Sequence, residues 1–267
     1  MTTEIFLQPL IHLFMHSPRI LSVGLSSGEE PLPKAGEGDL DVFVYCDNIP
    51  EESLRQSWYK NLPTSFVSEL HLTVFEHPFW GIGDSMRLNG VETWIMYFVV
   101  EEEIRYVQEI LHGNHLQKTE NYNYPVGRCA MFQKMKPLLD KNGFLSGMKE
   151  LVAVYPDSLA QRMLEFHSEQ LRDTEDLERA VARKDVLFYH FALDLALDHF
   201  LLALFGLNRV YFPSRKRSLD DLSTFQQKPV RCEERLLHIL HVGALPETLG
   251  ESFYEWTILV QELYGFL

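Results

Sequence analysis

Two aspartates stand at alternate positions in the run GDLDVFVY, residues 38–45. Side chains alternate in character from residue 39 to residue 46, so this segment predicts a strand with Asp39 and Asp41 on one face. Two carboxylates held side by side repel each other unless a cation lies between them. Because Mg²⁺ is bound by few carboxylates together with phosphate oxygens, the pair predicts a metal–nucleotide site.

A turn rich in glycine and serine precedes the pair. Residues 24–28 read GLSSG after a short apolar run, which predicts a strand entering a tight turn. The backbone N–H groups of such a turn, with the hydroxyls of Ser26 and Ser27, can hold phosphates. The same letters also match a hydrolase nucleophile elbow centred on Ser26. That alternative is dropped, because the turn follows the first strand and leads into a proline- and glycine-rich loop instead of a helix.

Together, the strand, the turn and an Asp-x-Asp opening the next strand resemble the signature of the DNA polymerase β-like nucleotidyltransferase superfamily. Gly24, Ser26 and Ser27 stand for the turn, and Asp39 and Asp41 for the metal-binding pair. A catalytic domain followed by a helical domain looks like the antibiotic nucleotidyltransferases and their bacterial relatives. The resemblance implies Mg²⁺-dependent transfer of a nucleoside monophosphate from an NTP to a hydroxyl of a small-molecule acceptor, with release of pyrophosphate.

The third carboxylate that the resemblance implies belongs to the next antiparallel strand, here GVETWIMY at residues 90–97. Trp94 stands where an acidic residue is expected. Glu92 lies two residues earlier on the same face and is the candidate that replaces it, the alternative being a solvent-exposed strand end. If Glu92 does not reach the metal, the chain binds nucleotide without efficient transfer, which suits a regulatory or partner-binding protein.

Polar side chains interrupt a strongly apolar helix predicted over 176–207. From residue 185 onward this helix is apolar almost all round, which predicts burial. His190, Asp194 and Asp198 are spaced by four residues and share one stripe. The stripe could line the acceptor site, with Asp194 or Asp198 as a general base or as a counter-charge for a cationic acceptor. The alternative is an internal network with arginines of neighbouring helices, namely Arg162, Arg172 or Arg183.

A concentrated basic run follows that helix. Arg209 and the triplet at residues 215–217 lie close together in an otherwise acidic chain. One interpretation is a clamp on the triphosphate across a cleft between two domains, with Lys216 as the first choice and Arg209 beside it. The alternative is a helix end carrying cations that suit its dipole.

Composition limits the class of protein. The 267 residues carry 24 Lys+Arg against 38 Asp+Glu, a net charge of −14, which argues against a nucleic-acid partner. The longest apolar stretch, 195–207, is interrupted by Asp198 and His199 and is too short for a bilayer, so no membrane is expected. Three scattered cysteines and a start without a basic, apolar leader predict a reducing, cytoplasmic location. The oligomeric state is left open.

The order of elements predicts an α+β fold of two domains. A mixed α/β nucleotidyltransferase-like domain is expected over 1–120, and an all-helical bundle that closes on substrate and nucleotide over 125–267. Strands are expected at 19–24, 39–46, 66–75 and 91–100, with a loop at 76–90. Later helices are expected at 130–139, 157–172, 176–207, 229–241 and 246–264.

Overall fold

The computed structural model describes residues 3–26, 32–34, 36, 38–119 and 123–266. The fold is α+β, as predicted, with a mixed six-stranded sheet and a helical carboxyl-terminal region. The chain forms two compact units, Met1–Gln108 with Met131–Val154, and Glu109–Ala130 with Tyr155–Leu267. This division differs from the predicted 1–120 and 125–267, because residues 131–154 return a strand and a helix to the first unit.

The sheet of the first unit has the strand order β3-β4-β5-β2-β1-β6. The strands are β1 (Ile20–Leu25), β2 (Asp39–Cys46), β3 (Val67–His77), β4 (Gly81–Leu88), β5 (Val91–Val99) and β6 (Lys136–Asp140). The central pair β2–β5 is parallel, and every other pair is antiparallel. The expectation that the strand at 91–97 runs antiparallel to β2 is therefore wrong; β5 is antiparallel to β4 instead.

Two strands lie where other structure was expected. The predicted loop at 76–90 contains β4, whose glycine-rich sequence has a weak intrinsic strand preference. The turn that follows it, Asn89-Gly90, has both residues at positive φ, the geometry of a tight hairpin. The predicted helix at 130–139 is confirmed only for residues 130–134, because α4 (Pro125–Lys134) ends there and β6 begins two residues later. Pro137 is tolerated there because β6 is an edge strand.

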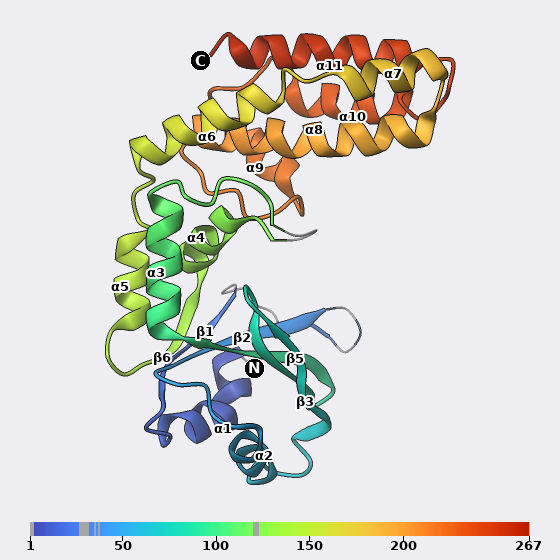
Figure 1. Ribbon diagram of the computed structural model, residues 1–267. Coiled ribbons are helices and arrows are strands. Elements are labelled where there is room, and N and C mark those ends of the chain that lie inside the picture. The colour runs from blue at the N-terminus through green and yellow to red at the C-terminus, as the bar shows by residue number, and fades with distance from the viewer. Residues whose placement is uncertain (1–2, 27–31, 35, 37, 120–122, 267) are drawn as a thin grey trace. The chain divides into compact units, whose positions relative to one another are not determined.

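The two faces of the sheet are covered differently. Helices α1 (Thr3–Met15) and α2 (Glu52–Lys60) cover one face (Figure 1). Their apolar side chains share a buried core with Leu40, Val42, Val44 and Cys46 of β2. On the other face, Tyr45 packs against Phe132 of α4 and Phe144 of α5 (Phe144–Leu151). That cover reaches the later part of β2, so its first residues project from an open part of the face.

Seven further helices lie in the described residues. They are α3 (Val100–Leu111), α6 (Asp157–Gln170), α7 (Glu175–Arg183), α8 (Val186–Leu207), α9 (Ser218–Thr224), α10 (Cys232–Val242) and α11 (Leu249–Tyr264). The helix predicted over 176–207 is two helices, because Lys184 adopts a left-handed conformation and the Asp185 side chain caps α8 by accepting from the Phe188 N–H.

Helix α8 was expected to be buried all round. Residues 200–207 are buried on every side, but Leu187, Phe191 and Leu195 are 84%, 60% and 47% exposed. Among the described residues α8 is also the one helix long and apolar enough to cross a bilayer, judged by length and composition. Because 61% of that segment is buried inside the protein and it carries the buried Asp198, α8 is the core helix of its unit.

Candidate active site

Acidic residues gather where β2 and β5 begin. Asp39 is the register partner of Glu92, and Asp41 is the register partner of Trp94. Register partners on neighbouring strands point to the same side of a sheet and lie about 4.8 Å apart in backbone. All four side chains therefore share one face of the two central strands. We call Asp39, Asp41 and Glu92 the carboxylate rim.

Solvent reaches the carboxylate rim and not the residues beyond it. Asp39 and Glu92 are exposed and Asp41 is half-buried. Further along the same face of β2 and β5, Phe43 and Met96 are 2% and 6% exposed. The face thus changes from a closed aromatic core to an open acidic edge within a few residues, and a ligand from solvent has access only to the acidic edge.

The glycine–serine turn lies directly beside this rim. Ser26 follows the last residue of β1, and its backbone N–H donates to the carbonyl oxygen of Asp41 over 3.2 Å. A Cβ atom at Gly24 would come within 2.5 Å of the Met135 sulfur, so the packing of that thioether favours glycine here. Ser27, the other predicted phosphate ligand, lies outside the described residues.

Glu92 already has two neighbours on its face. The indole Nε1 of Trp94 donates to its Oε1 over 3.2 Å. Arg87 of β4 is its register partner on the other side, and the charge of Glu92 helps to raise the pKa of Arg87, after the stronger contribution of Glu69. The Arg87 Nε donates to Glu69 over 2.7 Å. Arg87 is thus a cation beside the rim that sequence reasoning missed, because its strand was expected to be a loop.

The carboxylate rim offers oxygen ligands that suit a hard cation, but its side chains alone do not complete the coordination of a metal ion. Carboxylate oxygens suit Mg²⁺, which is typically bound by one or two of them with phosphate oxygens and water. Among the described residues, no group of three His, Cys, Asp or Glu side chains is placed to hold a metal ion. The fit is therefore to the Asp39–Asp41 pair with oxygens of a ligand, and Glu92 is not gathered into a preformed three-carboxylate site.

The predicted polar stripe of α8 is only partly assembled. Asp198 is buried and accepts from the Tyr124 hydroxyl over 2.5 Å, from Lys118 Nζ over 2.6 Å and from Arg215 Nε over 2.6 Å. Burial opposes its charge, but these hydrogen bonds outweigh burial and lower the pKa of Asp198. Arg215 also pairs with the exposed Asp194.

These partners differ from the predicted ones. An internal network for Asp198 was the alternative to a substrate role, with Arg162, Arg172 or Arg183 as partners. In the structure Arg162 donates to the carbonyl of His112, and Arg172 pairs with Glu169. His190, half-buried, packs edge-on against the Tyr189 ring and does not join the contacts of Asp198 described here.

The two predicted triphosphate ligands of this unit are exposed. Arg209 pairs with Asp157 at the start of α6 over 2.7 Å, with side chains 52% and 86% exposed. Lys216 is exposed, and its backbone N–H donates to the Ser214 hydroxyl over 3.1 Å. Their role in holding phosphates stays a prediction.

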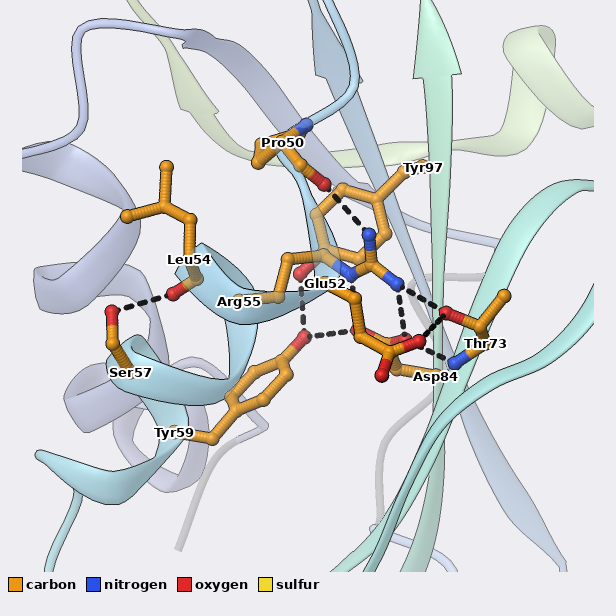
Figure 2. Close-up of polar contacts among 9 residues, drawn as sticks. All are labelled: Pro50, Glu52, Leu54, Arg55, Ser57, Tyr59, Thr73, Asp84 and Tyr97. Carbon is orange, nitrogen blue, oxygen red and sulfur yellow. Dashed lines mark hydrogen bonds and ion pairs between the residues drawn. The ribbon is translucent and has the colours of Figure 1, made fainter.

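A buried charged network on the opposite face of the sheet was also missed (Figure 2). Arg55 of α2 makes a two-pronged contact with Asp84 of β4, Nε to Oδ2 over 2.9 Å and Nη2 to Oδ1 over 3.0 Å. Tyr59 donates to the same carboxylate over 3.1 Å, and the hydroxyls of Tyr59 and Tyr97 are 2.5 Å apart. Burial opposes the charge of Arg55, but Asp84 outweighs it and raises the pKa of Arg55. This network ties α2 to the sheet.

Comparisons with known proteins give one partial family match and one remote structural similarity. Residues 121–217 match a family described as a domain of unknown function, DUF4037, which is less than half of the chain. A nucleotidyltransferase-like protein from Exiguobacterium sibiricum, known from a crystal structure, has 12% sequence identity and a TM-score of 0.42. The similarity covers 97% of this chain and 74% of that one. No curated protein matches the chain.

Proposed function

We propose that this protein transfers a nucleoside monophosphate from an NTP to a hydroxyl group of a small-molecule acceptor, with Mg²⁺ as cofactor and pyrophosphate as the second product. The observation that carries the proposal is the register of the sheet. It places Asp39, Asp41 and Glu92 on one open face, next to the turn that holds Ser26.

Each residue has a distinct part in this reaction. Asp39 and Asp41 would hold Mg²⁺, which would neutralise charge on the phosphates and make the acceptor hydroxyl more acidic. Ser26 and the neighbouring N–H groups would hold the leaving phosphates. Glu92 would take the proton of the acceptor hydroxyl, because it stands beside Asp39 on the next strand. Lys216 and Arg209 remain the proposed further ligands of the triphosphate, and Asp194 and His190 those of the acceptor. For Asp198 we favour the alternative of an internal network, because Lys118, Tyr124 and Arg215 already donate to its carboxylate.

A second candidate function rests on Trp94. The indole, not a carboxylate, is the register partner of Asp41, and Glu92 is hydrogen-bonded to that indole. A site in which two carboxylates bind the metal, while the third is held by a hydrogen bond to the indole, can bind Mg²⁺–NTP but would transfer the nucleoside monophosphate slowly. In that case the protein would serve as a nucleotide-dependent regulatory or partner-binding protein.

Pyrophosphate release separates the two functions. The protein is incubated with each of the four NTPs, Mg²⁺ and a panel of hydroxyl acceptors, and pyrophosphate is measured. Catalysis predicts release that Asp41→Asn lowers at least about a hundredfold. Asp47→Asn, an exposed acid at the far end of β2, is the matched control and should retain full release. Binding of Mg²⁺–NTP without release supports the second function, and no binding of any NTP contradicts both.

A further inference from the structure

Two aromatic side chains lie beside the carboxylate rim on the same face. Phe75 of β3 and Trp94 of β5 stack with ring centroids 6.0 Å apart and planes 30° apart. Gly83 lies between them on β4, and a Cβ atom there would come within 2.3 Å of the Phe75 ring. The missing side chain lets the ring of Phe75 lie across β4 and meet the indole. Both rings are half-buried. We call this pair the aromatic shelf.

The shelf is fixed relative to the rim. Trp94 is the register partner of Asp41, and its Nε1 donates to Glu92. That hydrogen bond restricts rotation of the indole, so the shelf offers a preorganised apolar surface at the edge of three carboxylates. Large aromatic side chains normally bury most of their area. A half-buried pair beside an acidic, solvent-accessible edge is therefore suited to contact a ligand.

The order of strands assigns the shelf to one side of the reaction. Strands β1 and β5 flank β2 on opposite sides. The turn with Ser26 follows β1, whereas the shelf stands on β5, β4 and β3. In phosphoryl transfer the attacking oxygen and the leaving oxygen lie roughly in line on opposite sides of phosphorus. If the leaving phosphates lie at Ser26, the attacking hydroxyl approaches from the shelf.

We propose that the acceptor carries a planar aromatic ring next to its reacting hydroxyl, and that this ring stacks on Trp94 and Phe75. The proposal rests on the proposed function and specifies its substrate class. The acceptor oxygen forms a bond to the α-phosphorus of the NTP, and the bond to the bridging oxygen breaks. Pyrophosphate leaves with that electron pair, and the hydroxyl proton passes to Glu92.

The test uses two alcohols that differ in the ring alone, 2-phenylethanol and 2-cyclohexylethanol. Their binding to the full-length protein is measured by saturation-transfer NMR, alone and with a saturating, non-hydrolysable Mg²⁺–ATP analogue. We expect the flat ring to bind more tightly than the puckered one. Trp94→Leu and Phe75→Leu should weaken its binding at least about fivefold, the lower end of what a lost stacking partner costs. Trp94→Phe should retain most of it.

Controls separate stacking from unfolding and from the parent function. Trp80→Leu, at the half-buried tryptophan before β4, should leave probe binding unchanged, and melting temperatures show whether each variant is folded. Three results would overturn the proposal that the shelf stacks on a ring. The two alcohols bind equally well, the parent protein binds neither, or folded Trp94→Leu binds 2-phenylethanol as tightly as the parent does. Displacement of the probe by the ATP analogue assigns the shelf to the nucleobase and overturns the acceptor assignment. Calorimetry with Mg²⁺–NTP alone tests the proposed function independently, because the probe needs no nucleotide.

Discussion

Buried and exposed carboxylates are treated in opposite ways in this molecule. Asp84 in the first unit and Asp198 in the second are both buried, and each is held by an arginine and by a tyrosine hydroxyl. The carboxylate rim, in contrast, stands at an open strand edge with Asp39 and Glu92 exposed. A buried carboxylate whose charge is compensated by fixed protein groups holds elements together. A pair at an open edge is accessible to a cation from solvent, and for this reason we propose the rim, and not the buried acids, as the metal-binding site.

The largest effect is expected from removing the cation that compensates a buried carboxylate. Arg55→Leu leaves Asp84, 0% exposed, without the cation that contacts both of its oxygens. We expect a loss of about 3–5 kcal/mol in the free energy of unfolding, measured by urea denaturation. Mg²⁺–NTP affinity of the folded fraction should stay unchanged, because the network lies on the other face of the sheet. A loss below about 1 kcal/mol, the range of exposed ion pairs, would contradict the distinction.

The stability of the second unit should depend on pH through a buried histidine. His167, next to the Asp198 network, contacts His199 through its Nδ1 over 2.8 Å and the Leu116 carbonyl through its Nε2 over 3.0 Å. Burial, followed by the charge of His199, lowers the pKa of His167 from 6.5 to about 3. The unfolded chain therefore binds a proton between these pH values that the folded chain does not, so stability falls as pH decreases.

The size of this effect is on the order of a few kcal/mol between about pH 6.5 and 3. Urea denaturation at several pH values measures it. His167→Gln keeps a donor for the Leu116 carbonyl but does not titrate, so its stability should depend less on pH over the same range. An equal pH dependence in parent and variant would show that His167 is not the group responsible.

The smallest effect is expected at an exposed pair. Arg209→Ala removes the contact with Asp157, whose side chain is 86% exposed, and should change the free energy of unfolding by no more than about 1 kcal/mol. Because folding is hardly affected, a several-fold loss of Mg²⁺–NTP affinity in this variant would show that Arg209 binds the triphosphate. Unchanged affinity would remove Arg209 from the proposed site.

Local patterns predicted the rim better than its surroundings. The alternation from Asp39 to Cys46 gave the bounds of β2 and the common face of its two aspartates, because side-chain direction in a strand follows from position alone. Parity in the same way placed Glu92 and Trp94 on one face of β5. Strand β4 was missed because Gly81–Leu88 has little strand preference, although Asn89-Gly90 is a strong hairpin signal.

Long-range pairings were beyond prediction from one sequence. Arg55 and Asp84 lie on elements whose packing sets their contact, and nothing local to either residue names the other. The partners of Asp198 show the same limit, since Lys118 and Tyr124 precede it by 80 and 74 residues, with the four helices α4–α7 and strand β6 in between. A charged residue on an apolar helix predicts that a partner exists. Which residue fills that role is decided by tertiary packing.

The most direct test of the account is calorimetric titration of Mg²⁺–NTP, with each of the four nucleotides, into three proteins. These are the parent chain, the Asp39→Asn/Asp41→Asn double variant and the Asp47→Asn control. We predict that the parent and the control bind at least one nucleotide equally well. The double variant should keep the parental melting temperature and lose affinity at least about tenfold, a difference of 1.4 kcal/mol. Equal affinity in the double variant and the parent would contradict the assignment of the carboxylate rim as the metal–nucleotide site.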